Sequence, residues 1–529
     1  MTLASVTSPD PTLTPHIPFR GRLDATASTQ SPCDASLERQ TKIVATLGPA
    51  TDAPGVLDGL VAAGLDCARL NCSHGTAQDL RRRAREVRAA AARAGRPLGL
   101  LFDLQGPKMR LAADTAERVL GIGDMLVFSD HAHAGDGDGA HAGNGDRAHA
   151  GNGDGAHVGN GDRAVVDFAG FSKLVTERSE IIIGDGVPRL AVEGTENGDV
   201  VARVVSTGRV GPGKGVNVTF ARPDLPAITE KDVVDLVVAV EQGADFVAMS
   251  FVRSGADIED LRRRLRDHGS RAQIVAKLES VEGYENLDDI LAAADGIMVA
   301  RGDYGVTAGL ARVPLMQKDV IARATRAGKH VITATQMLES MIGAPEPTRA
   351  EVADVANAVI DGTSAVMLSA ESSVGRHPVE AVRAMSVIAA AAEHSPDLRR
   401  SARDGAGGGT PAEAVMHAAV HLADELAAAA IVVPTATGGA ARACSKYRPR
   451  QPIIALAHDR SVAEQLTLEW GVFPVVANVA ESLDEFVATA LSVARDFAGL
   501  ASGDRIVVTN GRTPGAPGET NAIIDLTLA

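Results

Sequence analysis

Eight short apolar runs alternate with longer Ala- and Arg-rich stretches between residues 42 and 371, and this alternation constrains the fold more than any other feature. Near-continuous apolar runs of this length are typical of parallel strands that are covered on both faces. Candidate helices, such as 77–94 and 258–268, lie between most of them. The pattern predicts an α/β chain that closes into a (β/α)8 TIM barrel. The runs are KIVATLG (42–48), CARLNCSH (67–74), LGLLFDLQ (98–105), FVAMSFV (246–252), IVAKLE (274–279), GIMVARGD (296–303), HVITATQ (330–336) and SAVMLSAE (364–371).

Two further units accompany the predicted barrel. The third and fourth runs are about 140 residues apart, far more than one crossover needs, so a domain is inserted at 112–214. Runs such as EIIIGDG and DVVARVVS predict short antiparallel strands in this inserted β lid domain. The barrel therefore comprises 41–111 and 215–394. Residues 395–529 alternate a helix (411–427) with strands (430–435, 452–457, 471–476 and 505–511), which predicts a C-terminal α/β domain.

Two segments have no hydrophobic period. Residues 1–40 are rich in Ser, Thr, Pro and Ala, which predicts a disordered N-terminal extension; Asp10 and Asp24 argue against a transit peptide. Residues 135–166 repeat an octapeptide of the type GNGDGAHA. Calcium-binding β-rolls repeat every nine residues and carry a large apolar residue in each turn, so we favour a flexible loop over a metal site.

Charge and cysteine usage exclude several classes of protein. The formal net charge is −15, which disfavours a nucleic-acid partner. No run of eighteen apolar residues is present, so we expect no membrane-spanning helix. The four cysteines have neither metal-site nor disulfide spacing, which favours a reducing, cytoplasmic compartment.

Polar residues gather at the predicted carboxyl ends of the strands, where barrels of this type carry their active sites. Arg69, Asn71 and Ser73 are two apart and share one strand face, as do Lys277 and Glu279. Asp103 ends another run, and Arg301-Gly302-Asp303 ends a fourth. A lysine, an arginine and several carboxylates at one mouth suit a divalent cation with a phosphorylated substrate, and hence phosphoryl transfer.

The chain closely resembles pyruvate kinase across about residues 41–515 in its motifs. The matching segments are KIVATLGP, ARLNCSHG, GKGVNV, DLPAITEKD, AKLES, GIMVARGDYGV, TATQMLESM, PTRAEVADVANAV and SKYRPR. The resemblance implies that phosphoenolpyruvate gives its phosphoryl group to ADP, yielding pyruvate and ATP, which is the final step of glycolysis (EC 2.7.1.40). It also implies a homotetramer. A metal-dependent lyase or aldolase barrel and a catalytically inactive sugar-phosphate sensor are the alternatives; the lid and the intact Lys277, Glu279, Asp303 and Thr335 argue against them.

The same resemblance implies roles for individual residues. Lys277 stabilises the transferring phosphoryl group, Glu279 and Asp303 bind Mg2+ (or Mn2+), and Thr335 lies near the enolate face that takes up a proton. Asp185 closes over the nucleotide from the lid. Thr307 stands where many family members have an acid. The catalytic set is Lys277, Thr335 and Arg69; the substrate set is Lys277, Ala300, Arg301, Gly302, Asp303 and Thr335; the nucleotide set is Arg69, Asn71, His74, Arg110, Asp185 and Lys214.

A monovalent-cation site and an effector site complete the expectation. The family's monovalent-cation positions match Asn71, Ser73, Asp103 and the Leu104 carbonyl. Lys108 stands where potassium-requiring members have Glu, so we expect potassium not to be required, because an ammonium supplies the positive charge. The segment 434–450 resembles an effector loop for a phosphorylated sugar or nucleotide, with Thr435, Thr437, Gly438 and Gly439 forming the nest.

Overall fold

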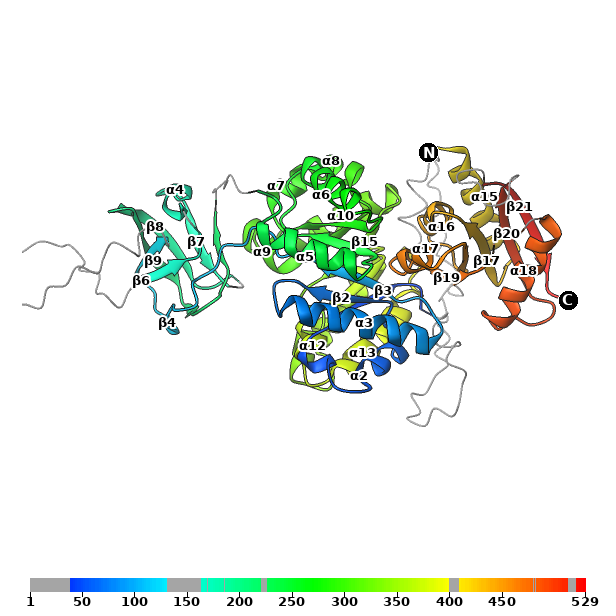
Figure 1. Ribbon diagram of the computed structural model, residues 1–529, viewed down its shortest axis with the longest axis horizontal. Coiled ribbons are helices and arrows are strands. Elements are labelled where there is room, and N and C mark those ends of the chain that lie inside the picture. Colours follow the sequence, from blue (N-terminus) through cyan, green and yellow to red (C-terminus); the bar gives the residue numbers. More distant parts are fainter. Residues whose placement is uncertain are drawn as a thin grey trace, which may run out of the picture.

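The computed structural model describes residues 39–130, 163–168, 170–184, 186–219, 226–398, 409–478, 480, 482–511 and 520–529. Four subjects of the sequence analysis lie outside the described residues: the N-terminal extension up to residue 38, the repeat up to residue 162, Asp185 and the side chain of Thr307. Three units follow one another in space, with the inserted β unit and the C-terminal unit at opposite ends of a central barrel (Figure 1).

The eight predicted runs form eight parallel strands of a closed barrel, which confirms the predicted fold class. The barrel order is β1-β16-β15-β14-β13-β12-β3-β2. The strands are β1 (Lys42–Thr46), β2 (Cys67–Asn71), β3 (Gly99–Asp103), β12 (Phe246–Met249), β13 (Gln273–Leu278), β14 (Gly296–Ala300), β15 (His330–Ala334) and β16 (Ala365–Leu368).

Helices surround the barrel, and several begin at a side-chain cap that the sequence encodes. The Thr76 hydroxyl accepts a hydrogen bond from the Asp79 N–H, and Gly95 ends the same helix at φ +64°. The barrel unit contains η1 (Pro49–Thr51), α2 (Val56–Ala62), α3 (Ala77–Ala94), α5 (Glu230–Glu241), α6 (Gly255–Asp267), α7 (Val281–Glu285), α8 (Leu287–Ala293), α9 (Arg301–Ala308), α10 (Val313–Arg326), η2 (Glu339–Ile342), α11 (Arg349–Ile360), α12 (Ala370–Ser373) and α13 (Pro378–Ala392).

The inserted unit is a six-stranded sheet of order β11-β7-β8-β9-β5-β6 with a small β10-β4 ribbon. Its strands pair antiparallel as predicted, except that β5 and β6 pair in parallel. Parallel pairing needs a connection of a dozen residues or more, and residues 131–162 provide that length. The elements are β4 (Arg118–Leu120), β5 (Met125–Asp130), β6 (Arg163–Val166), α4 (Phe171–Leu174), β7 (Glu180–Ile183), β8 (Arg189–Glu196), β9 (Asp199–Ser206), β10 (Gly208–Val210) and β11 (Val216–Val218).

The repeat does not remain a loop over its whole length, because its last four residues form β6. The final unit ends in RAVV, whereas the three earlier units end in GAHA, RAHA and GAHV. Val165 and Val166 supply the β-branched side chains that strands favour, and Val166 is fully buried. The expectation of a loop across 135–166 was therefore wrong for Arg163–Val166.

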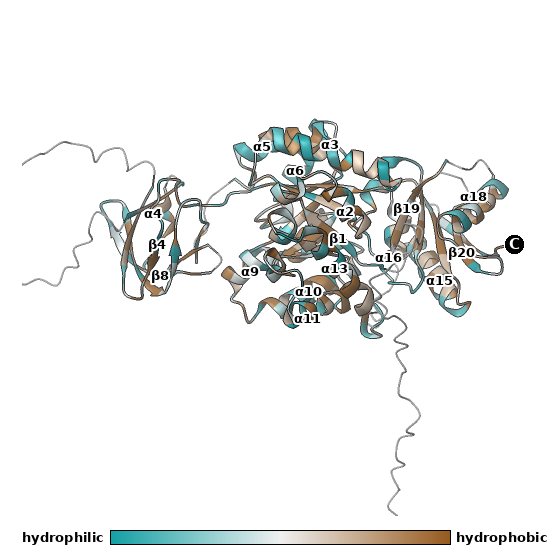
Figure 2. Cartoon of the chain, turned by 90° about the horizontal axis from the view of Figure 1, so that it is seen from below, coloured by the Kyte–Doolittle hydropathy of each residue, from teal (hydrophilic) through white to brown (hydrophobic). Residues whose placement is uncertain are grey.

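The C-terminal unit is a five-stranded sheet of order β19-β18-β17-β20-β21. Apolar residues lie along its strands, whereas α18 carries a mixture of polar and apolar residues (Figure 2). The sequence analysis missed β21, an antiparallel edge strand whose residues are half-buried or exposed and form no continuous apolar run. The elements are α15 (Pro411–Glu425), β17 (Ala430–Thr435), α16 (Gly439–Ser445), β18 (Ile453–Ala457), α17 (Arg460–Gln465), β19 (Val472–Val476), α18 (Leu483–Asp496), β20 (Arg505–Gly511) and β21 (Thr520–Thr527).

The C-terminal unit closes the floor of the barrel, at the amino ends of its strands. Leu468, between α17 and β19, is fully buried among barrel-interior side chains that include Val44, Leu101 and Ile332. A Cβ on Gly99, the first residue of β3, would lie 2.3 Å from the Thr467 hydroxyl oxygen. The contact between Gly99 and Thr467 thus leaves no room for a Cβ, and the segment around Leu468 is part of the barrel core.

We predict that Gly99→Ala destabilises the protein by about 1–3 kcal/mol, because the added methyl group would force Thr467 or β3 to move. Thermal unfolding monitored by circular dichroism would show a lower melting temperature. Gly194→Ala is the matched control, since nothing lies within 4 Å of a Cβ at Gly194. Equal melting temperatures for the two variants would contradict tight packing at the floor.

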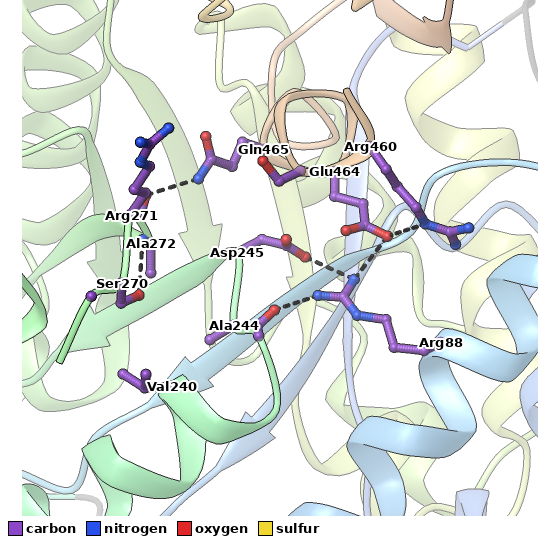
Figure 3. A pocket seen from close by; sticks show the side chains of 13 residues that line it. Arg88, Val240, Ala244, Asp245, Ser270, Arg271, Ala272, Arg460, Glu464 and Gln465 are labelled. Carbon is purple, nitrogen blue, oxygen red and sulfur yellow. Dashed lines mark hydrogen bonds and ion pairs between the residues drawn. The ribbon is translucent and has the colours of Figure 1, made fainter. Parts of the chain in front are cut away.

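A cavity of about 610 Å3 lies beside this floor, between the barrel and α17 (Figure 3). The Arg88 guanidinium lies 3.0 Å from the Asp245 carboxylate and 3.2 Å from the Glu464 carboxylate. Arg460 also pairs with Glu464, at 2.9 Å. These four charges neutralise one another, and their ion pairs link the barrel to the C-terminal unit across the cavity. The cavity lies at the floor, away from the barrel mouth.

Among the described helices, none is both long and apolar enough to cross a membrane.

Candidate active site

Lys277 lies at the centre of the polar cluster at the barrel mouth. It is the fifth residue of β13, and its ammonium lies 3.1 Å from Asp103 and 3.1 Å from Glu279. Its Nζ also donates to the Ser250 hydroxyl at 2.6 Å. Burial alone would lower the pKa of Lys277, but the two carboxylates raise that pKa above its ordinary value. A permanently charged, buried ammonium therefore stands where several strands end.

Arg69 lies on β2, which pairs with the Asp103-bearing strand β3, and it shares Asp103 with Lys277. Its Nε donates to an Asp103 carboxylate oxygen at 2.7 Å, and its Nη1 donates to the Thr46 hydroxyl at 2.9 Å. Burial would raise the pKa of Asp103, yet the charges of Lys277 and Arg69 hold it below its ordinary value. Asp103 thus orients both cations toward the mouth, as one carboxylate does for two neighbouring donors.

Glu279 and Asp303 supply the carboxylate side of the site. Glu279 is 2 % exposed, and one of its oxygens accepts the Phe251 N–H at 2.7 Å. Burial raises the pKa of Glu279, and the nearby negative charge of Asp303 adds to this rise. Asp303 lies in the first turn of α9, and one of its oxygens accepts from the Lys108 ammonium at 2.8 Å. The sequence-predicted pair is therefore brought together, with Lys108 beside it.

The turn between β14 and α9 carries the predicted substrate residues Ala300, Arg301 and Gly302. The Gly302 N–H donates to the Thr335 hydroxyl at 2.9 Å. The Arg301 side chain donates to the carbonyls of Ala334 and Thr335 and pairs with Asp354 at 2.7 Å. Arg301 therefore ties the start of α9 to the end of β15.

Thr335 follows β15 in a conformation that side-chain-bearing residues seldom adopt. Its φ is +68°, and that of Gln336 is +54°. Such conformations cost about 1–3 kcal/mol each and cluster at functional sites. The positive φ and the contact with Gly302 place the Thr335 hydroxyl at the same turn as the predicted substrate donors.

The other predicted nucleotide residues form a basic rim. Burial lowers the pKa of His74, and the positive charges of Arg110, Arg69 and Lys108 lower it further. Arg110 donates to the Gly213 carbonyl at 2.9 Å, where the inserted unit joins the barrel. Lys214 donates to the Arg209 carbonyl at 2.8 Å within the inserted unit.

The four positions predicted to bind a monovalent cation already make contacts within the protein. The Asn71 side-chain oxygen accepts the Ser73 N–H at 3.1 Å, and Asp103 pairs with Arg69 and Lys277. The Leu104 carbonyl accepts from the Ser250 hydroxyl at 2.8 Å. Lys108 contacts Asp303, and its ammonium lies 5.8 Å from the centre of the Phe251 ring.

The sequence analysis missed Ser250 and Phe251, which directly follow β12. Ser250 bridges Lys277 and Leu104, and Phe251 binds Glu279 through its N–H at φ +54°. A polar residue immediately after a buried strand was the available signal for Ser250. The backbone role of Phe251 leaves no such signal in the sequence.

The predicted effector loop follows β17 in the C-terminal unit. The Thr435 hydroxyl accepts the Gly438 N–H at 2.9 Å, and Gly438 has φ +83°. Gly439 begins α16, and Thr437 is exposed. A side chain at Gly438 would be strained and would meet the Arg442 guanidinium at 2.9 Å, so glycine is required there.

Comparison with known proteins agrees with this architecture. Residues 38–382 match the family model described as pyruvate kinase, barrel domain, and residues 413–524 match pyruvate kinase, alpha/beta domain. Pyruvate kinase of Bacillus licheniformis is 39% identical over 489 residues, covering 91% of this chain and 79% of the relative. Pyruvate kinase of Sporosarcina psychrophila is 37% identical over 91% of this chain and 79% of the relative. That of Clostridium acetobutylicum is 35% identical over 92% of this chain and 98% of the relative.

Proposed function

The chain belongs to the pyruvate kinase family, and from this membership we propose how its barrel mouth works as a phosphotransferase. The reaction moves the phosphoryl group of phosphoenolpyruvate to ADP. The bond between phosphorus and the enol oxygen breaks, and a bond to a terminal oxygen of ADP forms. The enolate that is left takes up a proton and becomes pyruvate. The observation that carries the proposal is the buried Lys277 ammonium, held by Asp103 and Glu279 at one barrel mouth.

Lys277 and Arg69 stabilise the transferring group. Phosphoryl transfer spreads negative charge over three oxygens, so fixed cations contribute most of the catalysis. Asp103 and Ser250 hold the Lys277 ammonium, and Asp103 and Thr46 hold the Arg69 guanidinium. Because these partners fix both cations before substrate binds, little reorganisation is needed during transfer.

Glu279 and Asp303 would hold the divalent ion that the pyruvate kinase family uses, which we propose to be Mg2+ or Mn2+. No cluster of three metal-binding side chains occurs among the described residues. Two carboxylates fit a hard ion that keeps water and substrate oxygens as its other ligands. Burial raises the pKa of Glu279 and the charge of Asp303 adds to this rise, so a cation between the two carboxylates would offset their repulsion. When bound, such an ion neutralises charge on the substrate oxygens.

The first turn of α9 would hold the substrate carboxylate. The N–H groups of Gly302 and Asp303 lie at the positive end of this helix. A carboxylate arriving there would take over the Gly302 N–H from the Thr335 hydroxyl. That hydroxyl would then be available beside the face of the enolate that takes up the proton.

The basic rim would bind ADP. The charges of Arg69 and Arg110 both act on His74, and Asn71 lies on the same strand as Arg69. Lys214 and Asp185 come from the inserted unit, so its movement toward the barrel would cover the nucleotide and exclude water.

Three further properties belong to this proposal. The 435–439 loop would bind a phosphorylated sugar or nucleotide, supported by its hydroxyls and the positive φ of Gly438. The enzyme would be a homotetramer, supported by two exposed leucines five positions apart, Leu310 (81%) and Leu315 (71%). A glycolytic reaction of this kind would take place in the cytoplasm.

The direct test is formation of pyruvate from phosphoenolpyruvate, dependent on both ADP and the divalent ion. A carbon–carbon lyase would act without ADP, and an inactive sugar-phosphate sensor would form no pyruvate. Either result would overturn the proposed function.

We predict that Leu310→Glu/Leu315→Glu lowers the assembly state, because burying two carboxylates at an apolar contact is costly. Sedimentation velocity would show a smaller species than the wild-type tetramer. Val119→Glu, at a 68% exposed site on the inserted unit, is the control and should leave the tetramer intact. An unchanged sedimentation coefficient for the double variant would place the contact elsewhere.

A further inference from the structure

Three polar side chains form a continuous bridge from the 435–439 loop to the barrel floor. The Arg442 Nε donates to Glu469 Oε1 at 3.1 Å, and the same oxygen lies 3.2 Å from His330 Nδ1. Glu469 is 3% exposed and His330 is 1% exposed. Such buried polar groups are costly unless they are paired, so this bridge is a built feature of the junction between the two units.

The outer end of the bridge is attached to the loop. Arg442 lies in α16, and its Nη1 donates to the Thr437 carbonyl at 3.2 Å. Its guanidinium also faces Gly438, where a Cβ would lie 2.9 Å from Nη2. The Nη2 group is buried and has no hydrogen-bond partner in the described part of the chain. An anion bound in this loop would find the Nη2 group unpaired, and drawing the guanidinium toward the loop would weaken its Nε contact with Glu469.

The inner end of the bridge touches two strands of the barrel. His330 is the first residue of β15, which leads to Thr335. Its ring lies against Gly296, the first residue of β14, so closely that a Cβ there would be 2.0 Å from Nε2. Strand β14 leads to Gly302 and Asp303. One imidazole thus contacts the base of both strands whose far ends carry the proposed substrate donors.

Glu469 is charged in this arrangement. Burial would raise the pKa of Glu469, but its hydrogen bond to His330 and the charges of His330 and Arg442 hold it below its ordinary value. If Arg442 turned toward a bound anion, the buried carboxylate would keep only His330 as a partner. The carboxylate and the imidazole would then have to rearrange, because an under-compensated buried charge is strongly unfavourable.

We propose that the Arg442–Glu469–His330 bridge couples the 435–439 loop to β14 and β15, so that engaging Arg442 at the loop changes the affinity of the active site for phosphoenolpyruvate. Arg442, Glu469 and His330 act as positioning residues, since none touches the reacting atoms. This inference rests on the proposed phosphoryl transfer for its readout and on the proposed loop ligand only for its second experiment.

The first experiment needs no loop ligand. Arg442→Met, Glu469→Gln and the double variant are compared with wild type by phosphoenolpyruvate saturation curves. We expect Arg442→Met to change KM about fivefold or more, the range of ordinary coupling energies, with kcat within about twofold. In the Glu469→Gln background the Arg442 substitution should have no further effect, because the bridge is already broken.

Glu464→Gln is the matched control. Glu464 is a second buried carboxylate of the same floor, but it pairs with Arg88 and Arg460 and not with Arg442. In its background, Arg442→Met should change KM as it does in wild type. Additive effects of the Arg442 and Glu469 substitutions, or an unchanged KM for Arg442→Met, would overturn the bridge.

The second experiment adds a probe, and it separates the two proposals. A hexose monophosphate is titrated into the tetramer by calorimetry, and KM is measured with and without it. If the hexose monophosphate binds and its effect on KM persists in Glu469→Gln, the bridge does not carry the coupling. The loop site would still stand. If the hexose monophosphate does not bind, the loop site is overturned for this probe. The double-variant comparison without ligand would still test whether the bridge carries the coupling. Binding with a shift that is lost in Glu469→Gln and kept in Glu464→Gln supports both.

Discussion

Lys277→Met is expected to fold and to lose phosphoryl transfer by about 10²-fold or more, since it removes a cation placed in advance where charge develops. The loss should fall mainly on kcat, because the ammonium acts on the transferring group more than on the bound substrate. Three partners, Asp103, Glu279 and Ser250, fix this ammonium within 3.1 Å. A coupled assay of pyruvate formation, at saturating phosphoenolpyruvate and ADP, gives the comparison.

The control for this variant is a second buried lysine of the same barrel. Lys42 lies at the opposite end of the barrel, in β1, and is 3% exposed. Its pKa is lowered to about 8, chiefly by burial, and its ammonium lies 4.1 Å from the centre of the Phe473 ring. Lys42→Met should keep near-normal turnover. Near-normal turnover of folded Lys277→Met, judged by its melting temperature, would mean that Lys277 is structural.

Near-full activity without potassium is the second large effect that we expect. Asp103 is already compensated by Arg69 and Lys277, and the Leu104 carbonyl already accepts from Ser250. The Lys108 ammonium adds a fixed positive charge 2.8 Å from Asp303. Because these fixed cations already supply positive charge at the mouth, a bound monovalent cation has little left to contribute. Activity in a buffer with only the divalent ion should be within about twofold of that with added potassium.

Lys108→Glu reverses the charge and should restore a response to potassium. The new carboxylate would face Asp303 without a cation, so a monovalent ion would lower the repulsion and raise activity. Initial rates across a potassium series, with the counter-ion held constant, provide the measurement. Lys173→Glu, an equal charge change on α4 of the inserted unit, should show no response. Many-fold potassium activation of the wild-type enzyme would contradict the expectation.

Much of the candidate site follows from local sequence because a parallel barrel places polar residues at one end of each strand. Arg69, Lys277 and Glu279 follow from alternation along β2 and β13, which orients every second side chain to one face. Asp303 follows from the end of β14, and the structure brings its carboxylate to the same mouth. The family motifs then assign these positions to a reaction, which position alone does not.

The parts that the sequence left undetermined depend on which distant segments meet. Ser250 and Phe251 enter the site through a hydroxyl and a backbone N–H, and neither contact has a pattern along the chain. The pairing of Lys108 with Asp303 joins residues 195 positions apart. The parallel pairing of β5 with β6 likewise depends on how the chain returns to the sheet.

By itself, the sequence determined the eight barrel strands, their polar ends and the three-unit order, because periodic burial and turn residues act over a few neighbours. Only the tertiary structure decided that Leu468 completes the barrel core and that Glu469 joins Arg442 to His330. The physical reason is that a buried charge is stable only beside its partners, and those partners come from separate units of the chain.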